Sequence, residues 1–247
     1  MKTEVGKYCF ARLALVLVFV CAGCVSADGP NGAKKDSIVP EDPLTGESIS
    51  PGKKWRAVYE NDFSSYAVNQ EPEDLFILDG SFSVQNVDKN KLLALPGDPL
   101  GDFGILFGPR IKGKPVELRC RMFSTRQGRR MPAFMAGLGG MNGFRFRIDC
   151  ASGKVRLIRG EEMLAEAPYA WKSGTWLHLR FRVEPLEGTG TKVFGKVWAD
   201  SDKEPLDWAL FHDNKESFGG GKCVLWGIPY AGSEILFDDL QAFSFAE

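Results

Sequence analysis

Short segments that alternate apolar and polar residues, each ended by glycine, proline, asparagine or aspartate, dominate the sequence after residue 54. A period of two places the apolar side chains on one face of a β-strand. The 28 glycines and 14 prolines interrupt nearly every window long enough for an amphipathic helix. The pattern therefore predicts an all-β fold. The expected strands are 55–60, 75–78, 81–87, 91–95, 103–107, 116–123, 143–148, 154–158, 175–183, 192–198, 222–228 and 234–245.

The number of expected strands limits the all-β architectures that the chain can form. About a dozen short strands exceed an immunoglobulin module and fit a two-sheet antiparallel jelly-roll sandwich with long connections, with a barrel as the alternative. We expect one such domain over residues 55–247. The formal net charge is -1, so the whole protein has no electrostatic attraction for phosphates and nucleic acid is not an expected partner.

The first 27 residues have the pattern of an export signal. Basic residues precede the apolar run 13–20, and small residues follow it. The run is shorter than the roughly 20 residues of a spanning helix, which makes a cleaved signal peptide the prediction and a membrane anchor the alternative. Val-Ser-Ala at 25–27 suits ordinary signal cleavage, whereas Cys-Ala-Gly-Cys at 21–24 resembles the lipobox of bacterial lipoproteins, with Cys21 where leucine is usual. We predict the second site, with a signal at 1–23 and lipid on Cys24, and keep the first as the alternative.

Residues 24–54 are rich in glycine, proline, serine and charge. Such a segment buries too little apolar surface to offset the entropy of ordering it. It is expected to act as a flexible tether that holds the domain on the order of 30 Å from an anchor. The expected location is the bacterial cell envelope, with the protein lipid-anchored there, or the periplasm or extracellular space if Cys24 carries no lipid.

Three cysteines, Cys120, Cys150 and Cys223, lie in the folded part of the chain. Cys120 and Cys150 lie on the apolar sides of alternating segments, so they could meet in the core. We expect each of them to be a buried free thiol, with a disulfide, which an oxidising compartment permits, as the alternative. The spacing does not indicate zinc.

Four motifs occur in order along the domain: Glu-Asn-Asp-Phe at 60–63, Gly-Phe-Arg-Phe at 143–146, Trp-Leu-His-Leu-Arg at 176–180 and Phe-Asp-Asp-Leu at 237–240. Together they resemble the concanavalin A-like and laminin G-like jelly rolls, nearest the bacterial secreted sugar-hydrolase domains of the 3-keto-disaccharide hydrolase family. The resemblance implies a glycan partner and a structural calcium where the first and last strands meet, with Asp62 and Asp238 as ligands. Calcium prefers such carboxylate oxygens. Alternatively, Asp62 only caps a turn and Asp238 is a solvated strand residue.

Catalytic residues are not evident in the sequence. Glycosidases of this fold carry Glu-x-Asp-x-x-Glu on one strand, which sets two carboxyls on one face; the run at 60–65 begins similarly but ends in serine. His178 alternates with leucines in a strand and is expected to be structural. His212 lies at a loop edge without an identified partner.

Arginines alternate with apolar residues in three segments. If these strands were neighbours in one sheet, six guanidinium groups would share a face and could bind the carboxylates or sulfates of an acidic polysaccharide. The alternative is that acidic residues pair with them on an outer, solvated sheet. The arginines are Arg119, Arg121, Arg145, Arg147, Arg180 and Arg182, and the acids are Glu117, Asp149, Glu162 and Glu184.

Aromatic residues near turn-forming residues could stack against sugar rings at the rim of the sandwich, although burial is the alternative for each. The rim candidates are Tyr169, Trp171, Trp208 and Tyr230, whereas Trp55, Trp176, Trp198 and Trp226 are expected in the core. The preferred function is an exported, surface-anchored module that binds a glycan or mediates adhesion without cleaving the glycan. The alternatives are a glycan-processing hydrolase and a structural envelope protein.

Overall fold

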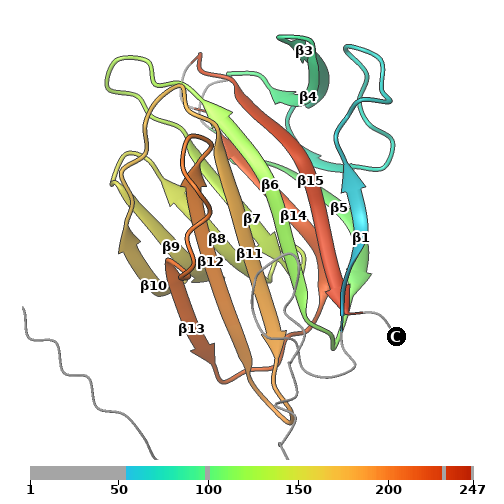
Figure 1. The fold of residues 1–247 in the computed structure, drawn as a ribbon, viewed down its shortest axis with the longest axis vertical. Coiled ribbons are helices and arrows are strands. Elements are labelled where there is room, and N and C mark those ends of the chain that lie inside the picture. The colour runs from blue at the N-terminus through green and yellow to red at the C-terminus, as the bar shows by residue number, and fades with distance from the viewer. Residues whose placement is uncertain (1–53, 98–100, 230–231, 246–247) are drawn as a thin grey trace, which may run out of the picture. The chain divides into compact units, whose positions relative to one another are not determined.

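Two antiparallel sheets packed face to face make up the domain (Figure 1). The computed structural model describes residues 54–97, 101–229 and 232–245, which contain fifteen strands and no helix. The predicted all-β sandwich is confirmed. Within these ranges there is accordingly no helix with the length and apolarity needed to cross a membrane. The predicted signal, the Cys24 site and the tether lie outside the described residues, apart from Lys54.

The larger sheet has eight strands and faces the viewer in Figure 1. The last strand of the chain, β15 (Ile235–Phe245), lies inside it and pairs along one side with β6. Its other side pairs with β4 near one end and with β1 near the other. The remaining strands, in the sheet order β13-β12-β11-β6-β15-β4-β3, are β13 (Leu210–Asn214), β12 (Thr191–Ala199), β11 (Leu177–Pro185), β6 (Val116–Ser124), β4 (Asn90–Leu95) and β3 (Ser83–Val87), with β1 (Trp55–Asn61) beside β15.

The smaller sheet has seven strands and lies behind the larger one in the same view (Figure 1). Its order is β10-β9-β8-β7-β14-β5-β2. The strands are β10 (Glu162–Pro168), β9 (Lys154–Arg159), β8 (Phe144–Asp149), β7 (Ala133–Leu138), β14 (Gly221–Ile228), β5 (Phe103–Ile111) and β2 (Phe76–Asp79).

Three strands, β7, β10 and β13, were not expected from the sequence. Every residue of β7 is buried, so this central strand has no apolar–polar alternation to detect. β10 and β13 are edge strands with several exposed residues. Their apolar pattern is correspondingly weak.

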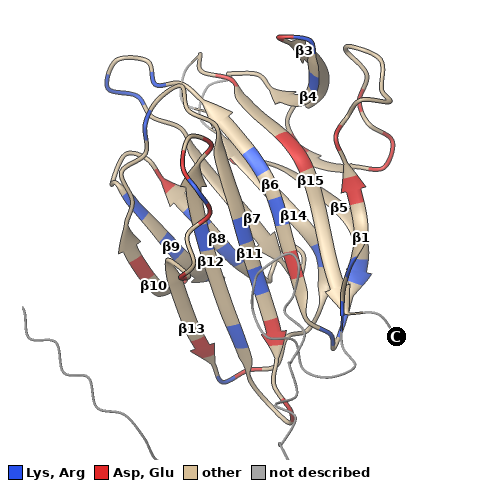
Figure 2. Cartoon of the chain, in the orientation of Figure 1, with Lys and Arg blue, Asp and Glu red and all other residues tan. Residues whose placement is uncertain are grey.

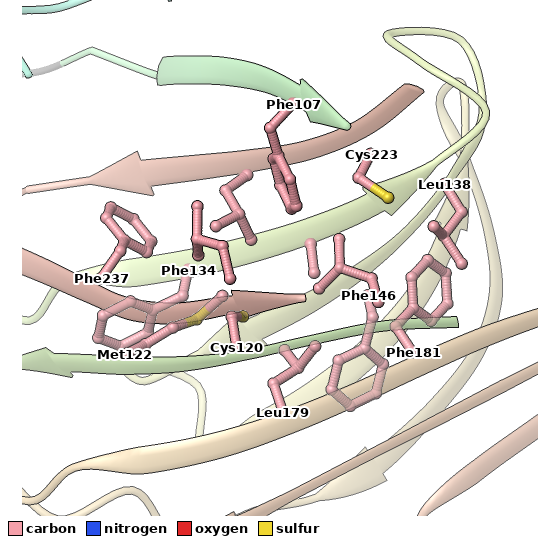
Figure 3. Close-up of a cluster of buried hydrophobic side chains, with 14 of the residues drawn as sticks. Phe107, Cys120, Met122, Phe134, Leu138, Phe146, Leu179, Phe181, Cys223 and Phe237 are labelled. Atoms are coloured by element: carbon pink, nitrogen blue, oxygen red, sulfur yellow. The ribbon is translucent and has the colours of Figure 1, made fainter. Parts of the chain in front are cut away.

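The inward-facing side chains of the two sheets form one large core (Figure 3). Phe146 of the smaller sheet stacks on Phe181 of the larger sheet with ring centroids 6.0 Å apart. Gly195 makes room for this pair, because a Cβ there would lie 2.3 Å from Cδ2 of Phe146. The close packing of the two sheets at this point thus requires a residue without a side chain at position 195.

The three cysteines of the domain are buried free thiols. The alternative of a disulfide between Cys120 and Cys150 is therefore not realised. Cys120 of β6 and Cys223 of β14 both point into the core, from opposite sheets (Figure 3). Burial raises the pKa of Cys223 to about 12 and raises the pKa of the other two thiols as well.

Candidate functional site

A groove of two adjoining cavities lies over the outer face of the larger sheet. The cavities have volumes of about 500 and 360 Å³ and share Asp239 and Gln241 of β15. We call the pair the outer groove. The first cavity is also lined by Glu60, Asn61, Asp62, Ser65, Tyr66 and Asp74, and the second by side chains that include Arg119, Arg121, His178, Arg180, Trp198 and Glu204.

A β-bulge in β15 places the acidic residue Asp239 between the two cavities. The pairing with β6 shifts between Asp238 and Gln241, and Asp239 has a φ of 50°. Aspartate tolerates this left-handed conformation better than most residues. The extra residue allows Leu240 to stay fully buried in the core while Asp239 lines the groove.

The first cavity contains a hydrogen-bond network centred on Asp74. Its carboxylate accepts hydrogen bonds from the hydroxyls of Tyr59 and Tyr66 at 2.5 and 2.6 Å, and from Nδ2 of Asn61 at 3.0 Å. Partial burial would raise the pKa of Asp74, but these bonds outweigh it and hold the pKa below its ordinary value. Burial and the bond to Asp74 raise the pKa of both tyrosines. The network therefore favours the charged form of the carboxylate and the protonated form of the two hydroxyls.

Arg121 lies in the second cavity and holds the bulge in place. It lies 3.2 Å from Asp238 and 3.4 Å from Asp239, and its guanidinium lies 4.7 Å from the ring centroid of Trp176. Asp238 also accepts a hydrogen bond from Asn90 at 2.7 Å. Burial, together with the neighbouring Asp239, raises the pKa of Asp238.

His178 and Trp198 form a stacked pair in the second cavity. They are direct partners across β11 and β12, and their rings lie 5.3 Å apart at an angle of 10°. Nε2 of His178 lies 2.6 Å from Oδ1 of Asp200. The prediction that Trp198 belongs to the core is wrong, since it lines the outer groove. Strand register decides this, and it was not visible in the sequence. Trp176 packs against a small buried apolar cluster of Leu92, Ala94 and Leu236.

The connection 200–209 between β12 and β13 covers one end of the outer groove. The ring of Trp208 lies 5.3, 5.0 and 4.8 Å from the cationic groups of Arg180, Arg182 and Lys196. Beneath them, the buried carboxylate of Glu117 contacts three arginines: Arg119 at 2.6 Å, Arg180 at 2.9 Å and Arg182 at 2.7 Å. Figure 2 shows these basic positions on β6, β11 and β12 beside acidic positions on β15.

The six arginines of the sequence prediction do not share a face. Arg145 and Arg147 belong to β8 in the smaller sheet, on the opposite side of the sandwich. The guanidinium of Arg145 donates to the carbonyl oxygen of Met141 at 3.0 Å and lies 5.3 Å from the ring centroid of Trp226. The four arginines of β6 and β11 do share a face, and there the alternative of acid–arginine pairing holds for Glu117 and Glu184.

The rim aromatics of the sequence prediction do not gather at the groove. Tyr169 and Trp171 are partly buried against the main core, and burial raises the pKa of Tyr169 to about 12. Trp208 covers the buried cations, and Tyr230 lies outside the described residues. Trp226, which was expected in the core, is buried in a second, smaller apolar cluster with Met135 and Val224. The missing side chains of Gly104 and Gly137 leave space there for its indole.

The residues do not fit the calcium site implied by the family resemblance. Oδ1 of Asp62 accepts from the backbone nitrogen and the hydroxyl of Ser64 at 3.0 and 2.7 Å, as a turn-capping aspartate does. The carboxylate oxygens of Asp238 accept hydrogen bonds from Asn90, Arg121 and the backbone nitrogen of Asp239. Among the described residues, no three His, Cys, Asp or Glu side chains are placed to hold a metal ion.

Comparison with known proteins identifies the fold. No family model matches the sequence, and no curated protein matches it. Among solved structures, the carbohydrate recognition domain of Emp47p matches with a TM-score of 0.54 and 8% identity, over 79% of this chain and 99% of that one. The marine PL-14 alginate lyase from Aplysia kurodai matches with a TM-score of 0.52 and 11% identity, over 76% and 99%.

A third solved structure, the potassium-bound carbohydrate recognition domain of Emp46p, has a TM-score of 0.53 and 11% identity, over 76% of this chain and 98% of that one. The chain is therefore a jelly-roll sandwich, consistent with the concanavalin A-like fold that the sequence predicted. Its membership of the 3-keto-disaccharide hydrolase family stays a prediction.

Proposed function

We propose that this protein is an exported glycan-binding module and that the outer groove is its binding surface. The observation that carries the proposal is the groove itself, about 500 and 360 Å³ in its two parts, with carboxylates, arginines and a stacked histidine–tryptophan pair along it. Sugars bind through hydroxyl hydrogen bonds to such planar polar groups and through contacts with aromatic rings.

The comparisons support this proposal at the level of the fold. Two of the similar solved structures are carbohydrate recognition domains, and a third is an alginate lyase. Three carboxyls of the groove do not have the pKa direction that a glycosidase acid requires. A glycosidase needs a carboxyl with a raised pKa as its general acid. Asp62, Asp74 and Glu204 of the groove all have a lowered pKa.

The raised pKa of Asp238 does not supply the missing acid, because this carboxyl is held by Arg121 and Asn90. Glycan binding is the function that the groove supports best, and we propose that it occurs without cleavage. A glycan array that includes neutral and uronic-acid polysaccharides tests it. We expect binding by the wild-type chain and weaker binding by Asp239→Asn, which keeps a residue tolerant of positive φ but removes one charge. Background signal for every glycan, from folded protein, would overturn the proposal.

Export and anchoring complete the proposed function. The support is the basic, apolar and small-residue order of the first residues and the lipobox-like segment that ends at Cys24. Cys24→Ser should move the native protein from the membrane fraction to the soluble fraction, and Cys9→Ser is the matched control. Unchanged fractionation of Cys24→Ser, or an unmodified mature N-terminus at Asp28 by mass spectrometry, would contradict lipidation and leave only export.

A further inference from the structure

Three buried cations lie side by side at the closed end of the outer groove. The side chains of Arg180, Arg182 and Lys196 come from the neighbouring strands β11 and β12, and their residues are 1%, 4% and 3% exposed. The carboxylate buried among them belongs to Glu117. Since buried charges are costly unless they are matched, the cluster needs further negative charge from its surroundings.

Glu204 supplies part of this charge from the covering connection 200–209. Its Oε1 accepts from Nη1 of Arg180 and lies 2.8 Å from Nζ of Lys196. The side chain of Glu204 is 35% exposed and lines the second cavity. It therefore lies between the buried cations and the space that a ligand would fill.

The connection that carries Glu204 is also held by contacts on both sides of it, including those of Asp200 with His178 and with the backbone of Trp176. Trp208 packs over the cations, and the carbonyl oxygen of Pro205 accepts from Nζ of Lys196 at 2.8 Å. Leu206, between them, is 94% exposed. The Glu204 side chain could thus rotate into solvent while the Trp208 contact stays in place.

We propose that Arg180 and Lys196 form a carboxylate-binding subsite of the outer groove. Glu204 fills this subsite in the free protein, and the carboxylate of a uronic acid replaces Glu204 when an acidic glycan binds. This inference rests on the proposed function and names its ligand class. An arginine beside an ammonium group suits a carboxylate because both cations donate to it.

Glu204 is then an intramolecular competitor. A carboxylate tethered by a short connection acts at an effective concentration on the order of millimolar. It lowers the apparent affinity for acidic glycans by occupying the subsite, as any internal occupant does. Neutral glycans do not use the subsite and are not affected.

The experiment is affinity electrophoresis of the full chain in gels that contain polygalacturonate or its methyl ester. Glu204→Gln should bind polygalacturonate on the order of tenfold more tightly than wild type, with no change for the ester. Asp207→Asn is the control, because it removes one charge from an exposed residue of the same connection. Equal affinities of Glu204→Gln and Asp207→Asn for polygalacturonate would overturn the inference.

A second readout uses the unmodified chain. Oligogalacturonate should shift the NMR signal of the Trp208 indole N–H, and the methyl ester should leave it in place. An unshifted signal at saturating oligogalacturonate would overturn the inference even if Glu204→Gln did not fold. If glycan affinity depends neither on the ligand carboxylate nor on Glu204, the subsite is refuted but the proposed function stands. If the chain binds no glycan in any assay, both the subsite and the proposed function are refuted.

Discussion

The carboxylate of Glu117 and the guanidinium of Arg182 lie 2.7 Å apart on the outer face of the larger sheet, and both side chains are almost completely buried. The outer face of a sandwich sheet is ordinarily solvated. Here the connection 200–209, with Trp208, covers it. The polar cluster at this end of the groove is therefore buried, and removal of one of its charges should destabilise the folded state.

Glu117 should make the free energy of unfolding depend on pH in the acidic range. Burial would raise its pKa, but Arg182, Arg180 and Arg119 lower it from 4.5 to about 2. A carboxyl with a depressed folded-state pKa adds stability above its unfolded pKa and loses it as pH falls through the folded one. The free energy of unfolding should thus fall by about 3 kcal/mol between about pH 4.5 and pH 2 from this group.

Urea titrations of wild type and Glu117→Gln measure this effect. At pH 7 the variant should lose about 3 kcal/mol, because it leaves arginines buried without their carboxylate, and the difference from wild type should shrink towards pH 2. Glu162→Gln, at an exposed position of β10, should lie within about 0.5 kcal/mol of wild type. A constant difference across the window would contradict the assignment.

Arg121 and Arg147 should differ in their effect on glycan binding, although the sequence pattern treats them alike. Arg121→Gln removes a cation that lines the outer groove and holds Asp239, so it should weaken binding about tenfold, as the loss of a charged hydrogen bond does. Arg147→Gln changes the opposite sheet and should leave affinity unchanged. Isothermal titration with a glycan selected on the array decides between the outer groove and the β8 face.

Gly195 should be intolerant of any side chain. A Cβ at this position would lie 2.3 Å from Cδ2 of Phe146, and overpacking of this kind costs about 1–3 kcal/mol. Gly195→Ala should therefore lower the unfolding midpoint in urea. Gly219 has no atom within 4 Å of its Cβ position, so Gly219→Ala should be neutral or slightly stabilising.

The three domain thiols should be inert in the native state. Burial raises the pKa of Cys120, Cys150 and Cys223, and only the thiolate reacts readily. A chromogenic disulfide reagent should label none of them in the folded protein and all three after denaturation. Labelling of only one thiol in the unfolded, unreduced domain would reveal a disulfide that the structure does not contain.

Several features of the site could not be predicted from the sequence, because they depend on the order of the strands in the sheets. The arginines of β6 and β11 meet since these strands pair, whereas those of β8 lie in the other sheet. Trp198 looked like a core residue among its apolar neighbours. Its pairing with His178 places it on the outer face, and a shift of one residue in register would reverse this.

The sequence by itself determined that this chain forms an all-β sandwich, because period-two alternation and frequent glycine and proline are local properties that act within each strand. It also supplied the charged and aromatic residues from which a binding surface could be built. Only the tertiary structure decided that Asp74, Asp239, Arg121 and His178 line one groove and that Glu204 covers Arg180. Those contacts join distant segments, and their geometry is set by strand order, by the bulge at Asp239 and by the path of one connection.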